Sequence, residues 1–226
     1  MKCTGEYTLP HKLAVNIERL NDKDISMPKL LLFLGCFLLA ISVLILNVPQ
    51  LAQFDWTAVQ WMHQHHLNSL NNLAAGLSAA GGMPFVLFLA VLWCLRLAWY
   101  KKYSDIVFIS TGIIGSIGLA WLLKCLISRP RPPEMYFLVK TYGDSFPSGH
   151  SLYAAALGCL AMYVYRRHSK HALICLLASA WILLMGVSRV YAGAHYPSDV
   201  LSGWSISFIW ITLLYWLMAR YPSANK

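Results

Sequence analysis

Charged residues are scarce in this sequence. Only 12% of its 226 residues are charged, 58% are hydrophobic, and the mean hydropathy is +0.54. Soluble domains carry about twice this fraction of charged residues. A water-soluble enzyme with a polar surface is therefore not expected, and the apolar content excludes intrinsic disorder. The composition is typical of a protein that crosses a membrane several times.

Paired cysteines and long basic runs are also missing. The six cysteines form no CxxC pair and are unevenly spaced, so we expect neither a disulfide framework nor a zinc site. The formal net charge is +9, but the lysines and arginines lie in short clusters between apolar stretches. Nucleic-acid binding requires a basic run on an otherwise polar face. We therefore expect a membrane, and no nucleic acid, as the partner.

Six apolar segments have about the length needed to cross a membrane as helices. They cover residues 30–48, 84–100, 106–123, 149–165, 172–188 and 200–219. Residues 49–83 form the longest connection and contain an amphipathic stretch at 54–70. We predict an all-α fold, a polytopic six-transmembrane-helix bundle at residues 29–219, between an N-terminal segment, 1–28, and a tail, 220–226.

The positions of lysine and arginine predict the orientation in the membrane. In the six-span arrangement, 13 of these residues lie on the side of the two termini and 5 lie on the opposite side. Because loops rich in lysine and arginine remain in the cytoplasm, both termini are predicted to be cytoplasmic. The compact chain is typical of a bacterial inner (cytoplasmic) membrane protein, whose opposite side faces the periplasm or the exterior. The five residues on that side are Lys124, Arg129, Arg131, Lys140 and Arg189.

Three sequence blocks stand out on the membrane face with few positive charges. They are K-x6-RP at Lys124–Pro132, PSGH at Pro147–His150 and SR-x5-H-x3-D at Ser188–Asp199. In the six-span arrangement all three emerge on the same face. We interpret Arg129 and Lys140 as topological residues, whereas the other three cations on this face belong to a site.

Several residues of these blocks suit the binding of a phosphate dianion. Lys124, Arg131 and Arg189 can neutralise its oxygens, and arginine does so through two hydrogen bonds. The Ser148–Gly149 turn at a helix start adds backbone N–H donors and the positive end of the helix dipole. The sequence has no cluster of acidic residues to hold Mg²⁺. We therefore expect neither a metal nor another cofactor.

The two histidines and the aspartate of the blocks suit phosphoryl transfer. His150 and His195 supply the residue type that can act as a nucleophile or a proton donor near neutral pH. Asp199 lies four residues after His195, from where it can reach one ring nitrogen and leave the other free to attack. A covalent phosphoryl transfer is therefore the chemistry that this set favours.

The three blocks resemble the signatures of the type 2 phosphatidic acid phosphatase superfamily, which is shared with vanadium haloperoxidases and bacterial phosphatidylglycerophosphatase B. The resemblance implies that His195 is the nucleophile that forms a phosphohistidine and that Asp199 orients it. It also implies that His150 protonates the leaving oxygen and then activates water. The residues that would hold the phosphoryl group are Lys124, Arg131, Ser148, Gly149 and Arg189.

This resemblance implies an integral-membrane phosphatase that hydrolyses a lipid phosphate or diphosphate. The substrates to consider are undecaprenyl diphosphate, phosphatidylglycerol phosphate and phosphatidic acid. Two other functions would use the same residues: a phosphotransferase that passes phosphate to an acceptor lipid such as lipid A, and a non-enzymatic transporter of lipid phosphates. The two histidines and the aspartate argue against the transporter, because binding alone needs neither a nucleophile nor a proton donor.

A second group of histidines, at His63, His65 and His66, could suggest a metal site. However, no thiol is nearby, and the nearest carboxylate is Asp55. We therefore predict a helix face at the membrane interface there, and not a set of metal ligands.

Overall fold

The chain folds into helices. The computed structural model describes residues 11–219, with side chains from residue 27 onward, and this range contains no strand. The helices are α1 His11–Asn47, α2 Pro49–Gln64, α3 Asn68–Gly81, α4 Met83–Trp99, α5 Tyr103–Ile127, α6 Gly149–Val164, α7 His171–Tyr191 and α8 Pro197–Ala219, with a short 3₁₀ helix, η1, at Glu134–Tyr136. The all-α prediction is confirmed.

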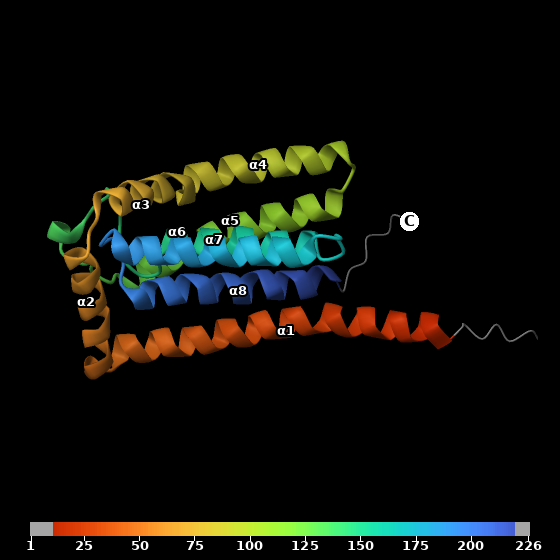
Figure 1. Cartoon of the computed structure of the whole chain (residues 1–226), viewed down its shortest axis with the longest axis horizontal. Coiled ribbons are helices and arrows are strands. Elements are labelled where there is room, and N and C mark those ends of the chain that lie inside the picture. The colour runs from red at the N-terminus through yellow and green to blue at the C-terminus, as the bar shows by residue number, and fades with distance from the viewer. Residues whose placement is uncertain (1–10, 220–226) are drawn as a thin grey trace, which may run out of the picture.

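The long helices run alongside one another and form a bundle (Figure 1). α1 packs along α8, and α6 packs against α5, α7 and α8. α6 forms the centre of the bundle, because most of its side chains are buried, among them Leu152, Ala156 and Leu160. α2 lies across one end of the bundle (Figure 1). The core is therefore built around the helix that follows the PSGH block.

Each of the six predicted apolar segments lies on a helix of its own. Among the residues that the structure describes, four helices are long and apolar enough to cross a membrane: α5, α7, α8 and the Met27–Asn47 part of α1. α4 passes the same test only together with α3, from which it is bent by 55°. α6 is shorter, with 16 residues. The prediction of a multi-pass helical membrane protein is confirmed, and the number of six spans is approximate.

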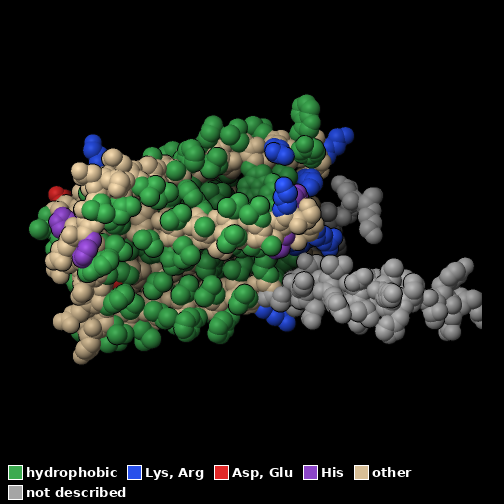
Figure 2. All heavy atoms as spheres, viewed as in Figure 1, with side chains coloured by type: hydrophobic (Ala, Val, Ile, Leu, Met, Phe, Trp, Pro, Cys, Tyr) green, Lys and Arg blue, Asp and Glu red, His purple; other side chains and the backbone are tan. Residues whose placement is uncertain are grey.

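The flank of the bundle is covered by hydrophobic side chains, whereas lysine and arginine side chains lie toward its ends (Figure 2). Phe33, Phe88 and Leu176 are examples of large apolar side chains that are mostly exposed. Soluble monomers rarely expose large continuous apolar surfaces. In a bilayer these side chains contact lipid tails, so the exposed surface is that of a membrane-embedded bundle.

The long connection at residues 49–83 is itself helical. α2 begins with Pro49 at its first turn, a position that suits proline because the first N–H groups of a helix have no intrahelical partner. One face of α2 buries Asp55 and Val59, while Phe54 and Trp61 are exposed. The amphipathic stretch predicted at 54–70 thus covers most of α2 and the start of α3.

The histidines of this connection lie at and just after the end of α2. The rings of His63 and His66 are in edge contact, with centroids 4.9 Å apart, and His66 Nε2 lies 2.9 Å from the carbonyl oxygen of Tyr191. Among the side chains that the structure describes, no group of three or more histidines, cysteines or acidic residues could hold a metal ion. The interfacial helix face remains a prediction.

Candidate active site

The three sequence blocks meet at one end of the bundle, around a cavity of about 610 Å³. The cavity lies where α5 and α7 end and where α6 begins, beside the bend between α3 and α4. Two of the predicted residues, Ser148 and Asp199, are fully buried. The other six line the cavity: Lys124, Arg131, Gly149, His150, Arg189 and His195.

The PSGH block forms the first turn of α6. Ser148 is the N-cap residue, and its side chain accepts a hydrogen bond from the backbone N–H of Ser151. The backbone N–H of Ser148 donates to the carbonyl oxygen of Asp199 at 2.9 Å, which fixes this turn to α8. Since Gly149 and His150 line the cavity, the positive end of the helix dipole faces the space where a phosphate could bind.

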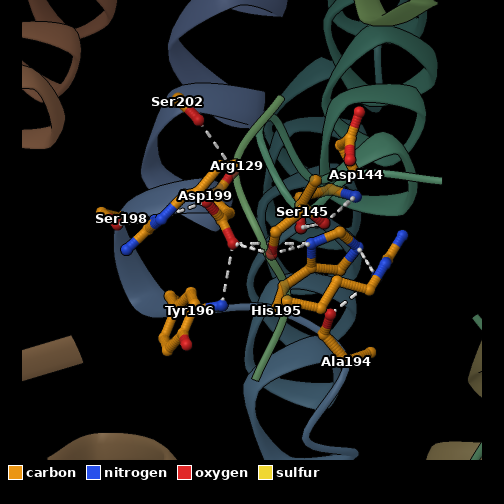
Figure 3. A network of polar contacts seen from close by, with 12 residues as sticks. Arg129, Asp144, Ser145, Ala194, His195, Tyr196, Ser198, Asp199 and Ser202 are labelled. Atoms are coloured by element: carbon orange, nitrogen blue, oxygen red, sulfur yellow. Dashed lines mark hydrogen bonds and ion pairs between the residues drawn. The ribbon is translucent and has the colours of Figure 1, made fainter. Parts of the chain in front are cut away.

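His195 and Asp199 form a pair at the start of α8. The distance from Nδ1 of His195 to Oδ2 of Asp199 is 3.6 Å. Oδ2 also accepts hydrogen bonds from Ser145 Oγ at 2.5 Å and from the backbone N–H of Tyr196 at 3.0 Å. Figure 3 shows these groups around the buried carboxylate. Asp199 is therefore held in one orientation, with Oδ2 directed toward the imidazole.

Arg131 determines which ring nitrogen of His195 carries the proton. Its Nη1 lies 3.2 Å from Nε2 of His195 and also donates to the carbonyl oxygen of Ala194 at 2.7 Å. A guanidinium group only donates hydrogen bonds, so Nε2 is the acceptor and the proton of the neutral ring lies on Nδ1, toward Asp199. This tautomer leaves the lone pair of Nε2 on the side opposite the carboxylate.

The neutral form of His195 is favoured by its surroundings. Burial, the largest cause, and the positive charges of Arg131 and Lys124 together lower the pKa of His195 from 6.5 to about 4, although the contact with Asp199 acts in the opposite direction. At neutral pH the ring is therefore uncharged. An uncharged ring with an unprotonated Nε2 can act as a nucleophile.

The three predicted phosphate-binding cations are held by neutral groups. Lys124 donates to the carbonyl oxygen of Asp144. Arg131 donates to the carbonyl oxygens of Gly143 and Tyr142 at 2.7 and 2.8 Å. Because carbonyl groups do not cancel a positive charge, these side chains can still attract an anion in the cavity.

Arg189 and His150 both contact α3, through Ser78. Arg189, which is 1% exposed, donates to Ser78 Oγ at 2.8 Å and to the carbonyl oxygen of Ala74 at 3.2 Å. Nε2 of His150 lies 3.1 Å from the carbonyl oxygen of Ser78. A carbonyl oxygen can only accept, so Nε2 of His150 carries a proton. Nothing in the sequence around Ser78 indicated that this serine would meet the blocks.

The topological interpretation of Arg129 is wrong. Its Nη1 donates to Asp199 Oδ1 at 2.6 Å and its Nη2 donates to Asp55 Oδ2 at 2.8 Å, so it is part of the polar network in Figure 3. Asp55 is the only acidic residue between positions 25 and 104. An isolated carboxylate in an apolar sequence needs a partner when it is buried. The sequence therefore indicated that Asp55 needs a cationic partner.

Lys140 was also interpreted as topological, yet it lines the cavity together with Val139 and Thr141. The loop between η1 and α6 brings Lys140 to the cavity. The loop folds back over the site, where Arg131 holds the carbonyl groups of residues 142 and 143. The spacing of residues along the sequence does not show that the loop between η1 and α6 folds back over the site.

The family model of the PAP2 superfamily matches residues 105–222, which contain all three blocks. The chain belongs to the PAP2 superfamily. Among its PAP2 relatives, phosphatidylglycerophosphatase B of Bacillus subtilis (strain 168) is 32% identical over 167 residues, which is 70% of this chain and 77% of that protein. Undecaprenyl-diphosphatase BcrC of the same organism is 26% identical over 151 residues, which is 64% of this chain and 73% of that protein.

A solved PAP2 structure has the same fold. The crystal structure of a transmembrane PAP2-type phosphatidylglycerolphosphate phosphatase from Bacillus subtilis superimposes with a TM-score of 0.76 at 25% sequence identity. The match covers 88% of this chain and 98% of that one. The predicted superfamily, the helical membrane fold and the class of enzyme, a membrane phosphatase, are thereby confirmed.

Proposed function

We propose that this PAP2 protein hydrolyses a lipid phosphate or diphosphate in two steps, through a phosphohistidine on His195. The observation that carries the proposal is the geometry of the His195 ring. His195 lines the cavity, its Nε2 is the unprotonated nitrogen, and Asp199 lies 3.6 Å from Nδ1. A nucleophile with an orienting carboxylate behind it is the arrangement required for covalent catalysis.

In the first step, Nε2 of His195 attacks the phosphorus atom. The new N–P bond forms while the bond from phosphorus to the leaving oxygen breaks. His150, which becomes protonated on both ring nitrogens beside the anionic phosphate, donates a proton to that oxygen and becomes neutral. A lipid alcohol therefore leaves from a monoester, and a lipid monophosphate leaves from a diphosphate. The ring of His195 now carries a positive charge, which the carboxylate of Asp199 stabilises.

In the second step, water attacks the phosphorus atom. His150 takes up the proton of this water molecule, the N–P bond breaks, and its electron pair returns to Nε2. Inorganic phosphate leaves and both histidines regain their starting protonation states. Lys124, Arg131 and Arg189 supply the positive charge that a metal ion provides in other phosphatases, so we expect the reaction to proceed without a metal.

The lining of the cavity supports a lipid as the substrate. Met83, Pro84 and Trp121 line the same cavity as the cationic side chains. A lipid phosphate matches this combination, because its headgroup is anionic and its chain is apolar. The names of the PAP2 relatives fit this class, and we propose undecaprenyl diphosphate, phosphatidylglycerol phosphate and phosphatidic acid as the substrates to compare.

We further propose that the site faces the periplasm or the exterior of a bacterial inner membrane. The lysines and arginines at residues 96–102 and 166–170 lie at the end of the bundle away from the three blocks. By the positive-inside rule that end is cytoplasmic, together with both termini. A lipid phosphatase with this orientation acts on lipids of the outer leaflet.

The test is phosphate release by the detergent-purified protein in EDTA, with the three lipids offered in parallel and His195→Ala as the control. We expect release from at least one lipid and a loss of about 10³-fold or more in the variant, because the covalent step is removed. Equal release by the folded variant contradicts the role of His195. Release that requires an acceptor lipid supports a phosphotransferase, and strict dependence on Mg²⁺ contradicts the cationic site.

A further inference from the structure

Arg129 bridges two buried carboxylates that come from different parts of the chain. Its Nη2 donates to Asp55 on α2 at 2.8 Å, and its Nη1 donates to Asp199 on α8 at 2.6 Å. The side chains of the two aspartates are 1% and 0% exposed. Neither Asp55 nor Arg129 is among the described residues that line the cavity, so we do not expect either of them to contact a phosphate bound there.

Asp55 is also bound to the first turn of α8. Its Oδ1 accepts a hydrogen bond from the backbone N–H of Ser198 at 3.0 Å, and its Oδ2 accepts one from the Ser198 hydroxyl. The first N–H groups of a helix have no intrahelical partner, and a carboxylate is stabilised there by the helix dipole. Asp55 therefore holds the beginning of the helix that carries Asp199, both directly and through Arg129.

This contribution comes from outside the sequence blocks. α2 precedes residues 105–222, the range that the PAP2 family model covers, and the connection that contains α2 carries none of the three signatures. The contact is nevertheless specific, because Nη1 of Arg129 also donates to the Ser198 hydroxyl at 2.7 Å and the guanidinium lies 4.3 Å above the ring of Tyr196. One face of the guanidinium group and both of its terminal nitrogens are thus constrained.

The charges of this group matter for the reaction. One arginine between two aspartates leaves the group of Asp55, Arg129 and Asp199 with a net charge of −1. When His195 is phosphorylated on Nε2 and protonated on Nδ1, its ring becomes positive next to this group. Without Asp55, Arg129 would neutralise Asp199 alone, and less negative charge would remain to stabilise the ring. In a buried site that excludes water, one unit of charge next to the ring changes the free energy of the phosphorylated state strongly.

We propose that Asp55 and Arg129 are positioning residues of the phosphatase reaction. Arg129 holds Oδ1 of Asp199 so that Oδ2 faces His195, and Asp55 shares the charge of Arg129 so that Asp199 keeps the negative charge which the phosphorylated ring needs. The inference rests on the proposed function of His195 as the nucleophile.

The kinetic test uses Asp55→Asn and Arg129→Gln in the full-length protein. Each variant is expected to lower kcat about 10- to 100-fold, the range for the loss of one hydrogen bond to a charged group. KM is expected to stay within about twofold of the wild type, because uniform substrate binding is unchanged. Glu134→Gln serves as the matched control: Glu134 is an exposed carboxylate on η1, and its removal is expected to leave kcat unchanged.

A second readout separates positioning from a purely structural role. Asp55→Asn removes a negative charge and is expected to lower the pKa of His195, whereas Arg129→Gln removes a positive charge and is expected to raise it. Loss of fold alone would not shift the two titrations in opposite directions. The titration is followed by ¹⁵N NMR of the imidazole ring without substrate, so it tests the coupling even if no lipid is hydrolysed and the proposed function fails.

The double variant, Asp55→Asn with Arg129→Gln, covers the case in which the single variants do not fold. It removes one negative and one positive charge together, so the net charge of the group stays at −1, as in the wild type. We expect a kcat below that of the wild type but a smaller loss than the two single losses combined, and a His195 pKa close to the wild-type value. A wild-type kcat in folded Asp55→Asn or in the double variant overturns the proposal, and so do titration shifts in the same direction.

Discussion

Arg131 and Asp199 lie on opposite sides of the His195 ring and act on different nitrogens. The guanidinium of Arg131 contacts Nε2 at 3.2 Å, and the carboxylate of Asp199 lies 3.6 Å from Nδ1. The two contacts together select one tautomer of the neutral ring. The chemistry proposed for this site therefore depends on the ring remaining uncharged at the pH of the reaction.

At the residue scale, we predict that His195 titrates far below an ordinary histidine. Burial lowers its pKa from 6.5 to about 4. The neutral, nucleophilic form therefore persists as the pH falls below 6.5 and is lost only when the pH falls through about 4. The measurement is a ¹⁵N NMR titration of the substrate-free protein labelled at histidine, with His195→Gln to assign the signal. A His195 ring that takes up its proton near pH 6.5 contradicts the prediction.

Six of the eight predicted site residues line the cavity, whereas the presence of Ser78 and Lys140 there could not be predicted, and neither could the residues behind the site. His150, His195 and Asp199 fall in short blocks whose residue types suit one reaction. Asp55 and Arg129 act through contacts between segments 74 positions apart. A sequence shows that a buried carboxylate needs a partner, but only the packing of α2 against the loop after α5 determines which cation is that partner.

At the scale of elements, the six apolar segments gave the clearest prediction of helices. All six appear as helices because a segment in lipid must satisfy its own backbone hydrogen bonds. The connection at 49–83 was harder to predict, since its polar and apolar residues alternate without a long run. Its two helices, α2 and α3, owe their place to contacts with α7 and α8, which are far away in the sequence.

The close packing of α6 and α8 leads to a prediction at the same scale. A Cβ atom on Gly203 of α8 would lie 2.7 Å from the carbonyl oxygen of Ser148 and 3.1 Å from the backbone nitrogen of Leu152. Backbone atoms cannot rotate away, so Gly203→Ala must push the two helices apart. We expect a loss of about 1–3 kcal/mol in stability, together with a lower kcat, because the Ser148 turn moves relative to Asp199.

The measurements are the Tm in detergent and phosphate release. Gly118→Ala is the matched control, since Gly118 lies within α5 and a Cβ atom there has no neighbour within 4 Å. Alanine favours a helix over glycine by about 1 kcal/mol, so this control is expected to keep or raise the Tm. An unchanged Tm and kcat in Gly203→Ala would show that the α6–α8 contact has no role in the site.

At the scale of the whole molecule, the orientation can be tested by labelling cysteines from one side. The test uses a background in which the six native cysteines are replaced by serine. Met135, on η1 next to the site, is 73% exposed, and Lys102 precedes α5 at the other end. We expect a membrane-impermeant maleimide to label Met135→Cys in intact spheroplasts and Lys102→Cys only after the membrane is opened. The reverse pattern would place the site in the cytoplasm.

The length of α6 has a consequence for how a substrate arrives. With 16 residues, α6 is shorter than the other helices of the bundle core, and it measures about 24 Å, whereas the hydrocarbon layer is about 30 Å thick. We therefore expect its N-terminal turn, which faces the cavity, to lie below the level of the headgroups. At that depth, a phosphate group would have to leave the headgroup layer and lose most of its hydration before it contacts His195. We therefore expect the enzyme to prefer phosphate esters that carry a long apolar chain over phosphate esters that are dissolved in water.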